Sequence, residues 1–161
     1  MRVLVISDSH GAVFDSHMDE MKKYGDFDIL VHCGDKYKDA QKFADKLNIS
    51  TVYQVPGNCD YDISGKEEIL LREICGRNVL ITHGHLHNVK LNIEALKAYA
   101  EDNGADAVLY GHTHGAQNDF IGNVLYFNPG STVFPRDGKP SFGVVEFTDS
   151  EIRGRIILLQ N

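Results

Sequence analysis

The chain has 161 residues, and 16 Lys and Arg against 23 Asp and Glu give it a formal net charge of −7. A chain of this length can bury roughly 70% of its unfolded surface, and we expect a single domain over residues 1–161. The acidic balance and the lack of a basic run argue against extended nucleic-acid binding, although they leave a small phosphorylated substrate open.

Cysteine usage and hydropathy narrow the class of protein further. Cys33, Cys59 and Cys75 are odd in number and show no CxxC spacing, so we expect neither a disulfide framework nor a thiolate zinc site. No signal-like segment precedes the first strand, and no apolar run reaches the roughly 20 residues of a membrane helix. These features predict a cytoplasmic protein that does not enter membranes.

The first half of the chain predicts strands and helices in alternation. Continuous apolar runs at residues 3–6, 29–31 and 51–55 are typical of strands buried on both faces. Between them, two helices are predicted by apolar faces at i, i+3, i+4 and i+7, formed by Phe14, His17, Met18 and Met21 and by Ala40, Phe43, Ala44 and Leu47. This order implies parallel strands, with all three following loops on one edge of the sheet.

The second half is richer in strands. We expect strands at residues 69–74, 78–82 and 106–110, a helix at 92–102, and two hairpins, 119–127 and 142–159. Gly122-Asn123 suits the type II′ turn of the first hairpin. Two β-rich halves with flanking helices are best packed as sheet on sheet, so the predicted fold is an α/β four-layer α-β-β-α sandwich of two mixed sheets.

Polar segments follow the apolar runs at five places. They are Asp8-Ser9-His10, Gly34-Asp35, Gly57-Asn58-Cys59-Asp60, His83-Gly84-His85 and Gly111-His112-Thr113-His114. On an extended segment alternate side chains share a face, so the first and last of these segments each form a pincer of metal-ligating atoms. Glycine recurs beside the candidate ligands, where the backbone must pass close to another group.

In this order the five segments resemble the blocks of the calcineurin-like metallophosphoesterases, Asp-x-His, Gly-Asp, Gly-Asn, Gly-His and Gly-His-x-His, over nearly the whole chain. The short length, the Gly-Asn-Cys-Asp variant and the later Asn128-Pro129-Gly130-Ser131 make it most similar to the small bacterial and archaeal YfcE-like phosphodiesterases. The resemblance implies one divalent ion held by Asp8, His10, Asp35 and His114, and a second held by Asp35, Asn58, His83 and His112. A bridging role suits Asp35, because a carboxylate can serve two cations and a neutral imidazole only one.

The expected reaction is hydrolysis of a small phosphoester by a hydroxide that bridges two ions about 3.5–4 Å apart. Two divalent ions, the carboxylates of Asp8 and Asp35 and one hydroxide leave a charge of about +1, which a phosphodiester balances and an ionised monoester exceeds. Donors of this kind suit Mn²⁺, which the resemblance also implies, with Ni²⁺, Fe²⁺, Zn²⁺ and Mg²⁺ as alternatives. Phosphomonoesters, nucleotides included, stay open as substrates.

At one position the chain departs from the family pattern. Many members have His after Gly-Asn, where this chain has Cys59, so the usual candidate for a general acid is missing. We expect that His85 supplies the proton to the leaving group, or that proton transfer to the leaving group is weak. In that case nitrophenyl esters should react faster than alkyl esters. Cys59 is interpreted as a small filler, or alternatively as a redox-sensitive thiol.

Several residues have simpler structural explanations. His17, His32 and His87 are interpreted as structural, and Asp8 and Asp35 taken alone fit helix caps. Asp60 and Asn128 either orient the ligands and the loops or form ordinary turns.

The enzyme hypothesis has a rival of another class. The family also resembles a retromer subunit that acts as a protein-binding scaffold, but a scaffold has no need of seven metal donors. A structural zinc site fits less well, since such sites favour thiolates and four ligands around one ion. Phe134 and Tyr37, if they are exposed, suggest a homodimer.

Overall fold

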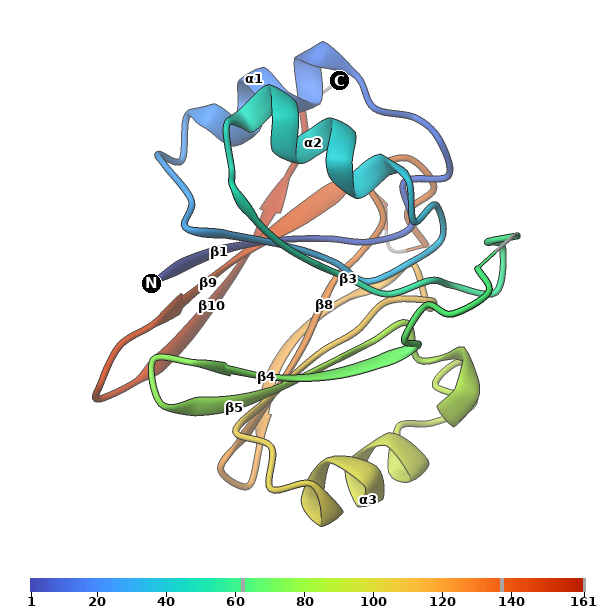
Figure 1. Cartoon of the computed structure of the whole chain (residues 1–161), viewed down its shortest axis with the longest axis vertical. Coiled ribbons are helices and arrows are strands. Elements are labelled where there is room, and N and C mark those ends of the chain that lie inside the picture. Colours follow the sequence, from blue (N-terminus) through green and yellow to red (C-terminus); the bar gives the residue numbers. More distant parts are fainter. Residues whose placement is uncertain (62, 137, 161) are drawn as a thin grey trace.

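The computed structural model describes residues 1–61, 63–136 and 138–160, and it consists of two packed β-sheets with helices on their outer faces (Figure 1). The four-layer α-β-β-α sandwich is therefore confirmed. Among the described residues, no helix combines the length and the apolar character needed to cross a membrane.

The first sheet has the strand order β10-β9-β1-β2-β3. Strands β1 (Arg2–Ile6), β2 (Ile29–His32) and β3 (Thr51–Gln54) are parallel, as predicted. Strands β9 (Ser141–Phe147) and β10 (Ile152–Leu158) form an antiparallel hairpin, and β9 pairs with β1. The last hairpin of the chain thus extends the sheet that the first strand begins.

The second sheet has the strand order β4-β5-β6-β8-β7. Its strands are β4 (Ile69–Ile74), β5 (Arg77–Thr82), β6 (Ala107–Leu109), β7 (Ala116–Ile121) and β8 (Val124–Pro129). β5, β6 and β8 run parallel, and β4 and β7 close the two edges in antiparallel pairs. Gly122, in the turn between β7 and β8, has a φ of +61°, as the leading residue of the expected turn requires.

Apolar residues fill three layers between these elements. One cluster lies between the sheets and includes Val5, Ile81 and Phe127. A second packs α1 (Asp15–Lys22) and α2 (Asp39–Leu47) on the first sheet, and a third packs α3 (Glu94–Asp102) on the second. Each sheet therefore buries both faces, which explains the continuous apolar runs of the central strands.

A few sequence predictions need correction. Phe14 is not on the buried face of α1; it precedes the helix and is 51% exposed. The predicted helix at 92–102 begins only at Glu94, because the Asn92 side chain accepts a hydrogen bond from the Glu94 N–H and so occupies the turn before it. Of the residues considered for a dimer surface, Phe134 is 62% exposed but Tyr37 is half-buried.

Candidate metal centre

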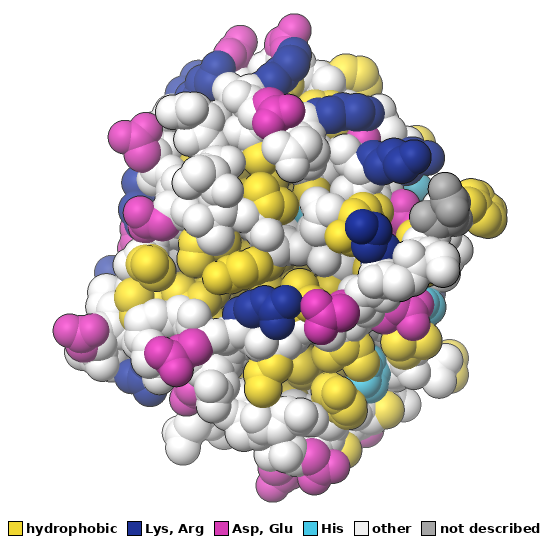
Figure 2. Space-filling model, in the orientation of Figure 1, with side chains coloured by type: hydrophobic (Ala, Val, Ile, Leu, Met, Phe, Trp, Pro, Cys, Tyr) yellow, Lys and Arg dark blue, Asp and Glu magenta, His cyan; other side chains and the backbone are white. Residues whose placement is uncertain are grey.

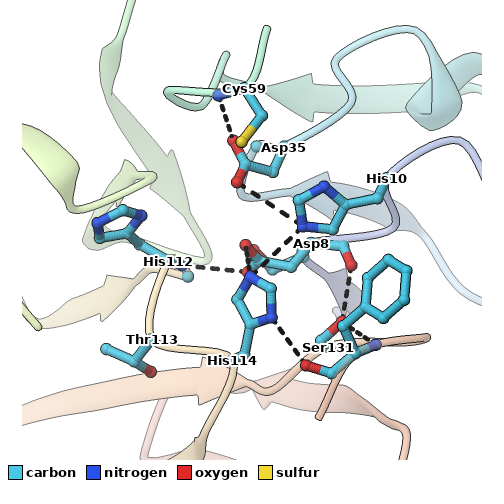
Figure 3. A network of polar contacts seen from close by, with 12 residues as sticks. Asp8, His10, Asp35, Cys59, His112, Thr113, His114 and Ser131 are labelled. Atoms are coloured by element: carbon cyan, nitrogen blue, oxygen red, sulfur yellow. Dashed lines mark hydrogen bonds and ion pairs between the residues drawn. The ribbon is translucent and has the colours of Figure 1, made fainter. Parts of the chain in front are cut away.

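The five polar segments meet at one end of the sandwich, where β1, β2, β3, β5 and β6 end. The side chains of His10 and His114 lie close together beneath Asp35, and His112 approaches from the other side (Figure 3). Five of the segment residues have left-handed backbone conformations, with φ between 47° and 70°: Asp8, His10, Asp35, His112 and His114. Such angles are costly for residues other than glycine and often occur at functional sites.

The first group of candidate ligands is Asp8, His10, Asp35 and His114. One ligand atom from each lies within 4.8 Å of those of the others. His114 Nε2 is 3.1 Å from Asp8 Oδ1 and 3.4 Å from His10 Nε2, and His10 Nε2 is 3.8 Å from Asp35 Oδ2. These four residues come from three different loops and surround one point.

The second group is Asp35, His83 and His112, whose ligand atoms also lie within 4.8 Å of one another. His83 Nε2 is 3.4 Å from Asp35 Oδ1 and 3.1 Å from His112 Nδ1. Asn58 Oδ1 is 3.2 Å from the same His83 nitrogen, so the amide faces this group as well. The structure thus brings all seven sequence-predicted ligands together, with Asp35 common to both groups.

Backbone carbonyls fix the tautomers of two imidazoles. His83 Nδ1 donates to the Cys33 carbonyl at 2.6 Å, and His114 Nδ1 donates to the Phe134 carbonyl at 2.7 Å. In the neutral rings the lone pair therefore lies on Nε2, which points into the site. A hydrogen bond that presents the other nitrogen in this way is typical of metal-binding histidines.

The electrostatics of the site reflect how closely its carboxylates and imidazoles lie. Burial raises the pKa of Asp8, but His114, His83 and the Ser7 hydroxyl outweigh it and lower that pKa. Burial likewise raises the pKa of Asp35, but His83 and the Cys59 N–H lower it by more, so the net shift is downward. Both carboxylates are therefore ionised at neutral pH.

The imidazoles shift in opposite directions. Asp8 raises the pKa of His114, and Asp35 and Asp8 raise that of His83 in spite of its burial. Burial, His83 and Lys90 lower the pKa of His112 to about 4.

The donor set fits divalent cations. Asp8 Oδ1 is buried, and when the His114 ring, whose Nε2 lies 3.1 Å away, is neutral, this oxygen has no hydrogen-bond donor among the described residues. Imidazole nitrogens that carry a lone pair lie 3.1–3.4 Å from carboxylate and amide oxygens. When the imidazoles are neutral, neither atom of these pairs carries a proton to donate. Acceptors packed in this way repel one another unless a cation or shared protons lie among them.

Glycines allow this close packing. A Cβ on Gly57 would overlap with the Asp35 carboxylate, and one on Gly34 would lie 2.7 Å from His83 Nδ1. A Cβ on Gly111 would overlap with the Ser7 hydroxyl and lie 2.8 Å from Asp8 Oδ2. Gly34, Gly57 and Gly111 are therefore required because each contacts a candidate ligand of a neighbouring loop.

Asp60 and Asn128 join the loops that carry the ligands. The Asp60 carboxylate accepts hydrogen bonds from the N–H groups of Gly57, Tyr37 and Lys36, so it ties the third segment to the second. Asn128 is buried and donates to the Gly111 carbonyl and to Thr113 Oγ1, which holds the last segment. Neither residue contacts an imidazole ligand through an identified hydrogen bond within the described chain.

A second supporting network was missed by sequence reasoning. His32 Nε2 lies 3.0 Å from Ser9 Oγ, and Ser9 Oγ donates to Asp39 Oδ2, which also accepts from the Gly11 N–H. Burial lowers the pKa of His32 to about 4, so the ring is neutral. The network fastens the Asp8-Ser9-His10 loop to β2 and α2. The only signal for it in the sequence is that Ser9 and His32 both lie at the ends of predicted buried strands.

His85 and Cys59 lie at the edge of the second group. The His85 ring centroid is 5.4 Å from that of His83, and its Nε2 is 3.7 Å from Glu68 Oε1. Burial and the neighbouring His83 lower the His85 pKa. Cys59 is exposed, and its N–H donates to Asp35 Oδ1, whereas burial and Asp35 raise the pKa of its thiol.

The fold and this group of candidate metal ligands fit a protein of the metallophosphoesterase class. The family model of the calcineurin-like phosphoesterase superfamily domain matches residues 1–150, and the chain belongs to that superfamily.

Among its relatives is the probable metallophosphoesterase YsnB of Bacillus subtilis, 36% identical over 136 residues that cover 84% of this chain and 78% of the relative. The phosphodiesterase YfcE of Escherichia coli is 32% identical over 118 residues, or 65% of this chain and 59% of YfcE. Vps29 of Entamoeba histolytica, solved with Zn²⁺, shares the fold with a TM-score of 0.80 and 23% identity, covering 99% of this chain and 100% of Vps29.

Proposed function

We propose that the protein is a phosphodiesterase that uses two divalent ions, preferably Mn²⁺, to hydrolyse a small phosphodiester. Asp8, His10, Asp35 and His114 would hold one ion, and Asp35, Asn58, His83 and His112 the other. The observation that carries the proposal is that two groups of ligand atoms share the carboxylate of Asp35. Ions bound there would lower the pKa of a water molecule and neutralise charge on the phosphoryl oxygens.

The chain's own residues prepare the site in two ways. Asp8 and Asp35 stay ionised because their pKa values are lowered, and the carbonyls of Cys33 and Phe134 keep His83 and His114 oriented. Asn58 is exposed at the mouth of the site, where it can contact both an ion and a bound phosphate. The ligands therefore need little rearrangement on binding, which favours tight coordination.

The preference for a diester rests on charge and on the relatives. Only Asp8 and Asp35 contribute negative charge within the two ligand groups, so two divalent ions, one hydroxide and one diester would bring the expected charge of the site near zero. YfcE, which is named a phosphodiesterase, is 32% identical to this chain over 118 residues.

His85 is the proposed source of the leaving-group proton, but its lowered pKa leaves the ring mostly neutral at pH 7. Proton donation would then be weak, and esters with good leaving groups should react fastest. Replacing His85 with Gln should slow an alkyl diester more than a nitrophenyl diester. Equal losses for the two esters would remove His85 from this role.

A protein-binding scaffold is the alternative, and the likeness to Vps29, at 23% identity, bears on the fold alone. The complete ligand set favours the enzyme. The deciding experiment strips the protein of metal, adds back Mn²⁺, Mg²⁺, Zn²⁺ and Ni²⁺ in turn, and measures hydrolysis of bis(p-nitrophenyl) phosphate and p-nitrophenyl phosphate.

We expect activity to be highest with Mn²⁺ and on the diester, and Asp35→Asn to lose roughly 1,000-fold in kcat. Asp19→Asn, at an exposed carboxylate outside the site, serves as the matched control. No activity with any of the four metals would favour the scaffold.

A further inference from the structure

The Lys and Arg side chains fall into two sets, depending on whether a carboxylate is nearby. Over α1 and α2, basic and acidic side chains lie next to one another (Figure 2). The cations within 4.0 Å of a carboxylate oxygen are Arg2, Lys22, Lys23, Lys42, Lys46, Arg72, Arg77, Lys97, Arg153 and Arg155. The cations with no such partner among the described residues are Lys36, Lys38, Lys66, Lys90, Arg136 and Lys139.

Most of these unpaired cations line hollows near the metal centre. Lys36, Lys38 and Lys66 surround a pocket of about 300 Å³ together with Tyr37 and Tyr61. Lys90 and Arg136 line a different hollow, whose wall includes the candidate ligand His114 itself. In a chain of net charge −7, cations that have no carboxylate partner among the described residues are available for an anionic ligand.

We call the second hollow the basic groove, and it is formed by Lys90, Thr113, His114, Phe134, Pro135 and Arg136. Its volume is about 240 Å³. It adjoins a hollow of about 400 Å³ that shares Lys90, Thr113 and Arg136 and is also lined by the apolar side chains of Val89 and Ile93. The basic groove thus leads from the metal ligands to a larger recess with cationic walls and a partly apolar floor.

The wall that carries Arg136 is fixed to the metal centre. The Arg136 N–H donates to the His114 carbonyl at 2.9 Å, and the Phe134 carbonyl accepts from His114 Nδ1. The Phe134 ring packs edge-on to His10 with 5.5 Å between centroids. Lys90 lines the same hollow as His114 and also lines the adjoining one.

We propose, on the basis of the proposed phosphodiesterase function, that the basic groove binds a second phosphate group carried by one arm of the substrate. The guanidinium of Arg136 and the ammonium of Lys90 are the cations that would hold it. The groove is favoured over the pocket with Lys36 and Lys66, because no candidate ligand lines that pocket. The substrate class is therefore a phosphodiester with a separate phosphate rather than a singly charged diester.

The test uses two esters with the same scissile bond and leaving group, thymidine 5′-(p-nitrophenyl phosphate) and its 3′-phosphorylated form. With the Mn²⁺-loaded protein we expect a higher kcat/KM for the 3′-phosphorylated ester, mainly through KM. Lys90→Met and Arg136→Met should each lower this preference about threefold, and the double variant about tenfold. Raising ionic strength should weaken the preference of the wild type, because exposed charges are screened.

Lys66→Met is the matched control, since it removes a cation from the other pocket, and Lys66 likewise has no carboxylate partner in the part of the chain that the structure describes. If Lys66→Met alone lowers the preference, or if the two esters have equal kcat/KM, the basic groove is not the phosphate site. If neither ester is hydrolysed, the proposed function fails. Titration calorimetry with two nucleotides then tests whether the basic groove binds a phosphate group. Thymidine 3′,5′-bisphosphate should then have a lower Kd than thymidine 5′-monophosphate in the wild type, and this difference in Kd should disappear in the double variant. Equal Kd values in the wild type would overturn the proposal.

Discussion

At the scale of single residues, the site combines ionised carboxylates with imidazoles of fixed tautomer. Asp8 and Asp35 have lowered pKa values, whereas His83 and His114 have raised ones because these carboxylates face them. Left-handed backbone at Asp8 and Asp35 aims the carboxylates at the imidazoles, and each such angle costs of the order of 1 kcal/mol. The hydrogen bonds around the loops offset that cost.

Metal binding should release protons near neutral pH. The raised pKa values leave His83 and His114 partly protonated in the metal-free protein at pH 7, and a cation must displace those protons. His112, with a pKa of about 4, contributes none. Affinity should therefore fall as pH decreases below the raised pKa values, and calorimetry in buffers of different ionisation enthalpy should give different heats at pH 7. Identical heats would contradict this assignment.

Cys59→His should restore proton donation to poor leaving groups. The Cys59 side chain is exposed while its N–H binds Asp35, so the larger ring can be accommodated without moving the backbone. We expect the rate for methyl p-nitrophenyl phosphate to change little and that for an alkyl diester to rise about tenfold or more. Cys75→His, at a cysteine outside the site, is the control. A uniform effect on both esters would argue against missing acid catalysis.

At the scale of elements, the loops that carry Asp8, Asp35 and His83 each leave room only for a glycine in a neighbouring loop. Gly57 lies in the loop after β3 but makes room for the Asp35 carboxylate from the loop after β2. Gly111, at the end of β6, makes room for Ser7 and Asp8 at the end of β1. At these two positions the glycine backbone of one loop therefore packs directly against side chains of another loop.

Gly57→Ala should abolish tight metal binding, because the new Cβ would displace the Asp35 carboxylate. Gly76→Ala is the control: Gly76 has a φ of +70° but open space around it, so it should lose about 1 kcal/mol of stability and keep its metal affinity. Metal content after dialysis, together with urea unfolding, measures the two effects separately. Full metal content in Gly57→Ala would show that the Asp35 carboxylate can move without loss of metal affinity.

At the scale of the whole molecule, the candidate metal centre lies where the two sheets meet. Asp8, His10 and Asp35 follow strands of the first sheet, whereas His83, His112 and His114 follow strands of the second. The last hairpin, β9 and β10, pairs with β1, so the first sheet contains both ends of the chain. Ions bound between the sheets should stabilise this arrangement against unfolding.

Adding Mn²⁺ at 100 times its Kd should stabilise the native protein by about 2.7 kcal/mol for one site. For a chain of this size that corresponds to a rise in Tm of about 5–10 °C. Differential scanning calorimetry with EDTA and with Mn²⁺ measures the shift, and Asp35→Asn should lose most of it. If Tm were the same in EDTA and in Mn²⁺, the ions would not bind at the sheet junction.

The sequence by itself determined the element types, the two-sheet class and the polar segments that carry the candidate ligands, because buried strands and glycine-flanked polar loops leave strong local patterns. It also determined that Asp35, with two oxygens, is suited to be shared. Local patterns could not reveal the pairing of β9 with β1, the network of Ser9, His32 and Asp39, or the placement of Lys90 beside Arg136. Those features join residues far apart in the chain, and only the packing of the two sheets decides which of them meet.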